Sequence, residues 1–300
     1  MKSLLRCLAV AALSLAGPVW AATPLDGAAQ VVVVTSDGWD STHGRLQAFA
    51  RTDAGWKAEG SAFDVALGRS GSAWGIGLHP AMSGDDASVG DDRWSSRASA
   101  GTRDDQRSSP TETRSPIDAA APNSIAATSG PRKREGDGRS PAGVFALGTA
   151  FGYAAQADTA LPWQPMQQSS YCMDVPDSPY YNRIVDAERV GAEAVEGSTE
   201  PMRLDLHNNG DVRYQQGFVI NHNPRNVPGQ GSCIFAHLWR KEGEATAGCT
   251  AMTAAHMQQL LAWLDPRSAP VFVLLPRAEY ARLQQAWQLP ALPAASGRAP

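Results

Sequence analysis

The sequence has no long apolar run after its first residues and no cluster of basic residues. The longest later apolar runs, residues 31–34 and 271–275, are far shorter than the ~20 residues of a membrane-spanning helix. A formal net charge of −4 without a basic run gives no reason to expect nucleic acid as a partner. Charged residues make up 19% and apolar residues 43% of the chain, which excludes a wholly disordered or collagen-like protein.

The first residues have the features of a secretory leader. Lys2 and Arg6 precede an apolar core, residues 7–16, and residues 19–21 (Val-Trp-Ala) match the small-x-small pattern before a cleavage site. The apolar core is too short to span a bilayer. We therefore expect residues 1–21 to be a signal peptide, and the mature protein to be exported to the periplasm or cell envelope without stable membrane insertion. An uncleaved anchor is the alternative.

Two segments of different composition follow the leader. Residues 30–79 combine β-branched and alternating runs with Gly-containing turns, a pattern that predicts a meander of about four strands. Residues 80–131 contain ten Ser and eight acidic residues against five basic ones, and only five large apolar side chains. Because so few apolar side chains cannot offset the entropy of ordering the segment, we expect a solvated, largely disordered insert.

The β pattern returns after an irregular aromatic stretch, residues 163–200. Four runs have strand-like patterns: residues 203–206, 212–214, 218–221 and 234–239. The turn residues 208–211 (Asn-Asn-Gly-Asp) predict a hairpin between the first two of these runs.

The last part of the chain changes to a helical period. A helix is expected directly after Cys249, with Thr253 as a cap. A buried strand over residues 271–275 and a final helix over 278–287 follow. The sequence thus predicts a β-rich α+β fold. The domain would cover residues 22–290, interrupted by the insert 80–131, and residues 291–300 would form a flexible tail.

Cys249 is the strongest candidate for a nucleophile. Gly248 precedes it and the predicted helix follows, and the amides and dipole of a helix N-terminus stabilise a thiolate. The backbone at Gly248 and Thr250 could also hold the oxyanion of a tetrahedral intermediate. His237 ends an apolar strand upstream and can serve as the general base. The alternatives are an inert buried cysteine and a structural histidine at a strand end.

The surroundings of these two residues resemble the active-site signature of the L,D-transpeptidases, the cysteine enzymes that cross-link bacterial peptidoglycan. The signature segments are residues 231–239 (GSCIFAHLW) and 246–249 (TAGC). Three further segments fit the branch of that family with a short loop between His and Cys: 135–145 (EGDGRSPAGVF), 177–182 (DSPYYN) and 218–223 (FVINHN).

The resemblance implies a β-sandwich with few helices and an acyltransferase that acts on peptidoglycan stem peptides. Cys249 matches the family's acylated nucleophile. His237 matches its general base, which these enzymes orient through a backbone carbonyl. Ala247 stands where the better-known signature has a second histidine, and this departure bears on substrate preference and rate. No cofactor is expected.

Other functions for the same residues stay open. The acyl group could pass to an amine, as in a transpeptidase, or to water, as in an L,D-carboxypeptidase. A non-catalytic wall-binding or scaffold protein could also have this fold. In the enzyme, we expect Asn221, His222 and Trp239 to line the cleft.

A zinc site is the main rival as a site type, because ligand residues cluster here. They are Cys233, His237, Cys249 and His256. In an extended strand, however, Cys233 and His237 would lie about 13 Å apart, too far for two ligands of one zinc ion. We therefore expect no metal.

The mature chain has an odd number of cysteines: Cys172, Cys233 and Cys249. If Cys249 stays reduced to act as the nucleophile, the other two are free to pair in an oxidising compartment. Such a bond would close a loop of about 60 residues and contribute on the order of 4 kcal/mol. The alternative is that Cys172 and Cys233 are both buried, reduced thiols.

Overall fold

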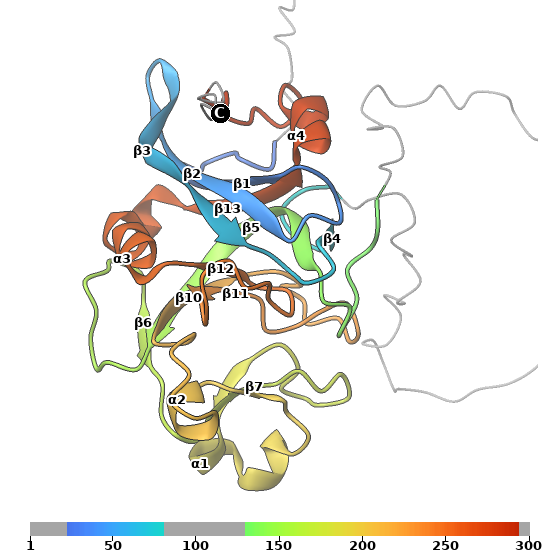
Figure 1. Cartoon of the computed structure of the whole chain (residues 1–300), viewed down its shortest axis with the longest axis vertical. Coiled ribbons are helices and arrows are strands. Elements are labelled where there is room, and N and C mark those ends of the chain that lie inside the picture. Colours follow the sequence, from blue (N-terminus) through green and yellow to red (C-terminus); the bar gives the residue numbers. More distant parts are fainter. Residues whose placement is uncertain (1–22, 81–129, 294–300) are drawn as a thin grey trace, which may run out of the picture.

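The structure, a computed structural model, describes residues 23–80 and 130–293 (Figure 1). The expected signal peptide, residues 81–129 of the expected insert and residues 294–300 of the expected tail lie outside the described residues. Within the described part, no helix is long and apolar enough to cross a membrane. Strands dominate and the helices are short, in agreement with the expected β-rich α+β class.

Most strands belong to one sheet, which we call the main sheet. It contains β1 (Gln30–Ser36), β2 (His43–Thr52), β3 (Gly55–Ala66), β4 (Ser72–Trp74), β5 (Ser140–Gly152), β6 (Trp163–Pro165), β10 (Gln216–Ile220), β11 (Phe235–Leu238), β12 (Thr250–Met252) and β13 (Val271–Pro276). β1, β2 and β3 form an antiparallel meander, whereas β4 pairs in parallel with β5. β13, from the far end of the chain, runs parallel to β1.

The main sheet closes on itself through β5. This long strand pairs with β13 through residues 143–146 and with β10 through residues 147–152, and β10 continues through β11 and β12 to β3. The register shifts between Phe218 and Ile220, and such irregularities let a strand bend between partners. The result is a barrel-like arrangement rather than the two packed sheets of the expected sandwich.

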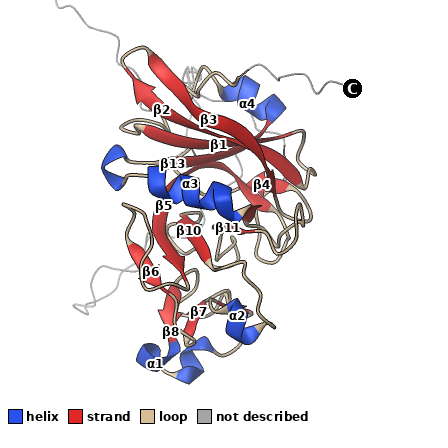
Figure 2. Ribbon diagram, turned by 60° about the vertical axis from the view of Figure 1, so that its left-hand side comes forward, coloured by secondary structure: helices blue, strands red, loops and turns tan. Residues whose placement is uncertain are grey.

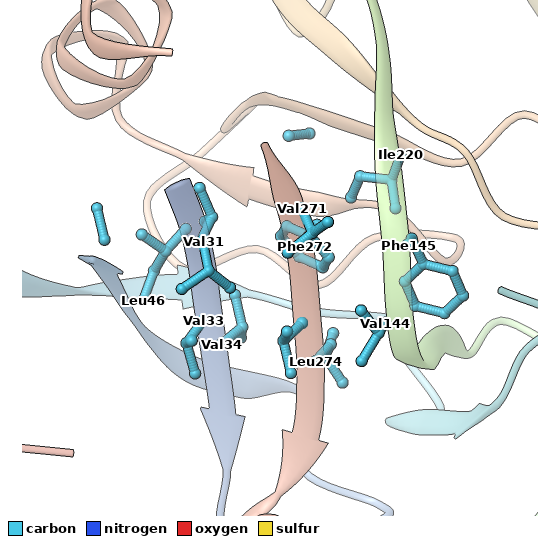
Figure 3. Close-up of a cluster of buried hydrophobic side chains, with 14 of the residues drawn as sticks. Val31, Val33, Val34, Leu46, Val144, Phe145, Ile220, Val271, Phe272 and Leu274 are labelled. Carbon is cyan, nitrogen blue, oxygen red and sulfur yellow. The ribbon is translucent and has the colours of Figure 1, made fainter. Parts of the chain in front are cut away.

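The aliphatic core lies around β1, β13 and β5 (Figure 3). Every residue of β1 and β13 is buried, as is typical of parallel strands covered on both faces. Val31 and Val33 of β1 lie beside Phe272 and Leu274 of β13, with Phe145 of β5 beyond them. α3 (Ala254–Trp263) packs against β10 and β11, and α4 (Arg277–Leu283) packs against β1 and β13. The core therefore anchors the strands that carry the candidate site.

A smaller unit, residues 166–214, projects from one end of the main sheet (Figures 1 and 2). We call it the small subdomain. Its elements are β7 (Ser170–Cys172), β8 (Ile184–Asp186), α1 (Ala187–Val190), a 3-10 turn (Ala192–Val195), β9 (Glu200–Pro201) and α2 (Leu204–His207). β7 pairs with β8 on one side and with β9 on the other. All of these elements are short.

The hairpin predicted around residues 208–211 is wrong. The N–H of Asn208 bonds to the carbonyl of Leu204 and closes the helical turn α2. Asn209 and Gly210 then adopt φ values of +50° and +78°, which Asn and Gly tolerate best. The turn buries Leu204 in the small subdomain. Packing of that side chain therefore prevails over the hairpin signal.

The helices near the C-terminus also differ from their predicted bounds. The helix expected directly after Cys249 begins only at Ala254, with Thr253 as its N-cap. The intervening residues pair with β11 as β12, so a strand separates the cysteine from the helix. The final helix, α4, ends at Leu283 instead of residue 287.

Candidate active site

Strands β11 and β12 bring His237 and Cys249 together. Phe235 and His237 both contact the ring of Tyr214, at centroid distances of 5.5 and 5.4 Å, so they face the same side of β11. Cys249, which precedes the parallel neighbour β12, accepts a hydrogen bond at Sγ from the Phe235 N–H, 3.3 Å away. His237 and Cys249 are 3% and 7% exposed. Two residues from separate sequence motifs thus lie in one buried cluster.

The loop before β12 fixes the backbone of Cys249. The carbonyl of Cys249 accepts hydrogen bonds from the hydroxyls of Thr246, at 2.7 Å, and Ser140, at 3.0 Å. Its Sγ lies 3.5 Å from the carbonyl oxygen of Cys233. Thr246 and Ser140 belong to two of the segments that resemble the family, so these segments meet at the candidate nucleophile.

Gly248 has a backbone role. Its φ is +152°, and a Cβ at this position would lie 3.0 Å from the carbonyl oxygen of Arg139, so a larger residue would be strained. Its N–H donates to Thr246 Oγ1 at 3.0 Å and is not free to bind an oxyanion. Thr250, the other residue expected to do so, lies in β12 opposite Ala236. Gly248 thus has a structural role in the resting protein, and an oxyanion role for Gly248 and Thr250 stays a prediction.

The thiol of Cys249 is not activated in the way that the sequence predicts. Burial raises the pKa of Cys249 to about 12, and the negative charge of Glu200 adds to this rise, which the Phe235 N–H and the positive charge of Arg213 oppose. Because β12 separates the cysteine from α3, no helix N-terminus stabilises a thiolate. The resting group is a neutral thiol.

His237 is a neutral base with a fixed tautomer. Its Nδ1 lies 2.7 Å from the carbonyl oxygen of Leu238. Because a carbonyl oxygen only accepts, Nδ1 carries the hydrogen and Nε2 keeps its lone pair. Burial lowers the pKa of His237 to about 4, so the imidazole is uncharged at neutral pH. A backbone carbonyl orients this histidine, as the resemblance implies.

Two residues beside this pair were not predicted from the sequence. Tyr214 is buried, and its ring meets that of His237 edge-on at an interplanar angle of 78°. Its hydroxyl donates to Glu200 in β9. Burial raises the pKa of Glu200 to about 7 and raises the pKa of Tyr214 well above its usual value. The contact depends on how the small subdomain folds against β11, so no local pattern could have indicated it.

His222, expected to line the cleft, is enclosed by other loops. Its Nδ1 accepts a hydrogen bond from the Ile76 N–H at 3.2 Å, and its Nε2–H donates to the Gln230 carbonyl at 2.9 Å. Burial lowers the pKa of His222 to about 4. This neutral ring links two loops, which is a structural role.

Asn221 and Trp239, the other expected cleft residues, have different surroundings. Asn221 is exposed. Trp239 lines an open groove of about 1020 Å³ over β1, β2 and β3, and the lining of this groove includes neither Cys249 nor His237. Trp239 therefore faces a groove that does not contain the reacting groups, and a cleft role for Asn221 stays a prediction.

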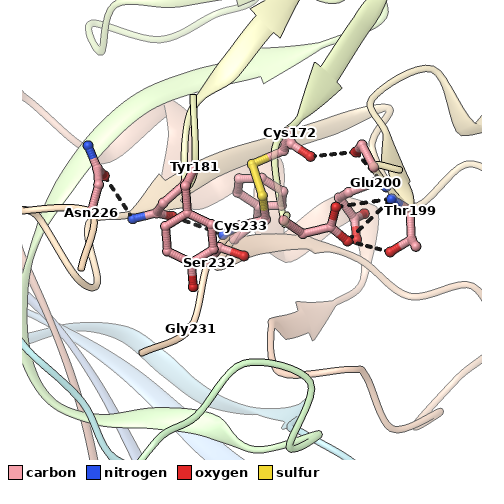
Figure 4. The surroundings of a disulfide bond; sticks show 12 residues. Cys172, Tyr181, Thr199, Glu200, Asn226, Gly231, Ser232 and Cys233 are labelled. Carbon is pink, nitrogen blue, oxygen red and sulfur yellow. Dashed lines mark hydrogen bonds between the residues drawn. A yellow bond between two sulfur atoms is a disulfide. The ribbon is translucent and has the colours of Figure 1, made fainter. Parts of the chain in front are cut away.

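A disulfide joins Cys172 to Cys233, with Cα atoms 5.9 Å apart (Figure 4). It links β7 of the small subdomain to the segment that leads into β11. Cys249 is free, as expected for the reduced member of the three. The N–H of Cys233 also donates to Asn182 Oδ1 at 3.0 Å. Because its sulfur is bonded to Cys172, Cys233 is no thiolate ligand for the zinc site considered above.

We compared the chain with family models, with curated proteins and with solved structures to determine its family. A family model described as YkuD, L,D-transpeptidase catalytic domain, matches residues 90–273. Neither the curated proteins nor the solved structures gave a match. The matched residues make up more than half of the chain and include β5 to β12, with both His237 and Cys249. The chain therefore belongs to the YkuD family of L,D-transpeptidase catalytic domains.

Proposed function

We propose that this chain is an exported L,D-transpeptidase, which forms a thioester between Cys249 and a peptidoglycan stem peptide with His237 as the base. The observation that carries the proposal is that a free, buried thiol bonds to the Phe235 N–H of β11, the strand that also carries a buried imidazole whose tautomer is fixed by a backbone carbonyl. Family membership supports the reaction class.

In the proposed reaction, attack starts from a neutral pair. As Cys249 Sγ attacks the carbonyl carbon of the stem peptide, His237 Nε2 takes the thiol proton. The tetrahedral intermediate collapses by breaking the C–N bond, and His237 gives the proton to the leaving amine. The thioester then waits for an acceptor, which is an amine in transpeptidation and water in carboxypeptidation.

The neutral pair suits an exported enzyme. The thiolate is the form that reacts with oxidants, and a raised thiol pKa keeps its population low until a substrate is bound. The disulfide between Cys172 and Cys233 supports export to the periplasm or cell envelope, because such bonds persist in oxidising compartments.

The test is mass spectrometry of muropeptides incubated with the purified mature protein. The wild type should produce cross-linked muropeptides, or trimmed stems if water is the acceptor. Cys249→Ala should abolish both products. His237→Ala should lose turnover while keeping its melting temperature, and Glu196→Gln, a change at an exposed position of the small subdomain, serves as the control.

Two results would count against the proposal. Products from the Cys249→Ala protein would exclude Cys249 as the nucleophile. Binding of the wild type to peptidoglycan without any turnover would indicate a wall-binding or scaffold protein instead.

A further inference from the structure

The disulfide connects the strand of Glu200 to the backbone around the nucleophile. In β9 it lies opposite Cys172 of β7, and Cys172 is bonded to Cys233. The carbonyl oxygen of Cys233 lies 3.5 Å from Cys249 Sγ. Figure 4 shows Glu200 next to this disulfide. The backbone that carries Glu200 is thus tied to the backbone that surrounds the thiol.

A second set of contacts leads from Glu200 to the same place. Tyr214 donates its hydroxyl hydrogen to Glu200 Oε1. The buried Tyr214 ring meets the rings of His237 and Phe235 edge-on, and the Phe235 N–H donates to Cys249 Sγ. The Tyr214 ring therefore connects the carboxylate of Glu200 to the base, His237, and to Phe235, whose N–H bonds to the nucleophile.

The carboxylate of Glu200 has no cationic partner among the described residues. Its Oε2 accepts no hydrogen bond from them. The nearby guanidinium of Arg213 is engaged by Asp211 through Nε and Nη2, at 2.9 Å each, and Asp174 adds another negative charge in the vicinity. A partly buried carboxylate without a cation is costly. The site thus favours a positively charged ligand group.

The other buried pairing of a tyrosine with a glutamate in the described chain differs. Glu135 Oε2 accepts hydrogen bonds from both the Tyr181 hydroxyl and the Ser232 hydroxyl. Glu135 therefore has two donors on one carboxylate oxygen, whereas Glu200 has a single donor; the second oxygen of each has no donor among the described residues. Glu200 thus accepts fewer hydrogen bonds than Glu135 does.

We propose that Glu200 binds the ammonium group of the acyl acceptor and removes one of its protons before attack. This inference rests on the proposed function, because it needs a thioester on Cys249. It gives the small subdomain a role in choosing between amine and water as the acceptor. Anionic groups are repelled from the same place.

The proposed transfer balances as follows. The acceptor ammonium gives one proton to the Glu200 carboxylate and becomes a neutral amine. The nitrogen lone pair forms a C–N bond to the thioester carbon, and the C–S bond breaks with its electron pair on Cys249 Sγ. His237 carries a second nitrogen proton to that sulfur, which restores the thiol, and Glu200 releases its proton to solvent. The products are an amide, the free enzyme and one proton.

Chemical features of Glu200 fit this role. Burial, Asp174 and Asp211 raise its pKa to about 7, while Tyr214 and Arg213 oppose the rise. A base of that pKa can accept a proton near neutral pH and release it again. The charge of Glu200 also raises the pKa of Cys249, so an ammonium bound beside it would offset that charge.

The experiment uses Glu200→Gln in the mature protein, because the amide keeps an oxygen for the Tyr214 hydroxyl. Glu196→Gln is the matched control: it removes one charge from an exposed position of the same subdomain. A stem peptide serves as donor. Methylamine, a charged acceptor, is compared with hydroxylamine, which is largely uncharged at pH 7, and with water.

With Glu200→Gln, kcat/KM for methylamine should fall about 10- to 100-fold, the loss expected for a hydrogen bond to a charged group. Hydroxylamine transfer, hydrolysis and acyl-enzyme formation should stay within about twofold. Iodoacetamide should label Cys249 faster, because the thiol pKa falls. Glu200→Asp should keep more of the preference for methylamine than Glu200→Gln does.

Equal losses with all three acceptors would overturn the proposal and assign Glu200 a structural role. So would an unchanged ratio of methylamine transfer to hydrolysis. Failure of the proposed function would look different, because the wild type would then form no acyl-enzyme at all.

Discussion

The main sheet and the small subdomain are held together by different means. β1 pairs with both β2 and β13 over six positions each, and all its residues are buried. By contrast, β7, β8 and β9 are two or three residues long, and α1 buries none of its residues. The small subdomain depends on the Cys172–Cys233 bond and on single contacts, such as that of the Ser198 hydroxyl to the Cys172 carbonyl at 2.9 Å.

The two regions contribute different residues to the candidate site. Cys249 and His237 belong to the main sheet, where cooperative strand pairing fixes them. Glu200 and Tyr214 lie in the small subdomain, where short strands, one disulfide and a small buried cluster hold them. Regions with few buried contacts open at lower free energy than the core. We therefore expect that the small subdomain can be disturbed without unfolding the main sheet, and that the reverse is not true.

The largest effect on stability is expected in the main sheet. Phe272 is completely buried in β13, so Phe272→Ala should lower the free energy of unfolding by about 3–5 kcal/mol. Val185→Ala, at a half-buried position of β8, should cost less than about 1 kcal/mol. Denaturant unfolding at pH 7 measures both. Similar losses would contradict the contrast between the two regions.

The double substitution Cys172→Ser with Cys233→Ser should release the small subdomain. The residues are 61 positions apart, and closing a loop of that length is worth about 4 kcal/mol in the chain-entropy model. Limited proteolysis should first cut residues 166–214 while the main sheet resists, and turnover should fall. Unchanged protease resistance together with full turnover would show that the disulfide does not hold the small subdomain in place.

Lowering the pH should change the contributions of the two regions to the free energy of unfolding in opposite directions. Burial lowers the pKa of His222 and His237 to about 4. The unfolded chain therefore binds more protons as pH falls from about 6.5 to 4, and each histidine costs about 2 kcal/mol of stability at pH 5. The pKa of Glu200 is raised to about 7, so the folded state binds that proton first. This contributes about 2 kcal/mol of stability between pH 7 and pH 5.

Glu200→Gln lacks this opposing group, so it should lose about 2 kcal/mol more than the wild type on going from pH 7 to pH 5. Urea unfolding of both proteins at the two pH values gives this difference. Equal acid sensitivity of the two proteins would contradict the raised pKa of Glu200.

The smallest effect is expected from the segment predicted to be an insert, residues 80–131. Replacing its residues 81–129 with a short Gly/Ser linker should leave the melting temperature and turnover near those of the wild type, because loop-closure cost depends only weakly on length. A large loss of either property would assign these residues to the site or to a partner-binding arm.

Some parts of the molecule could be predicted because short sequence patterns indicate them. The apolar run at residues 271–275 and the alternating runs before residue 80 coincide with strands. The segments around His237 and Cys249 match a family signature, and the odd cysteine count indicates the pair that the disulfide joins. Each of these features depends on residues close together in the sequence or on simple counting.

The remaining features depend on which distant segments meet. No local pattern states that β5 pairs with both β13 and β10, so the closed arrangement could not be predicted. The contact between Glu200 and Tyr214 arises for the same reason. The thiol pKa was wrongly predicted because the short strand β12, and not a helix, follows Cys249, and because burial outweighs the local donors.

The central claim is that Cys249 carries the acyl group, and intact-protein mass spectrometry tests it most directly. The mature protein is mixed with a stem peptide, quenched with acid and weighed. We expect an added mass equal to the stem peptide without its leaving group, located on Cys249 by peptide mapping and absent from Cys249→Ala. An adduct of the same mass on the Cys249→Ala protein, or turnover by a wild type that forms no adduct on Cys249, would contradict it.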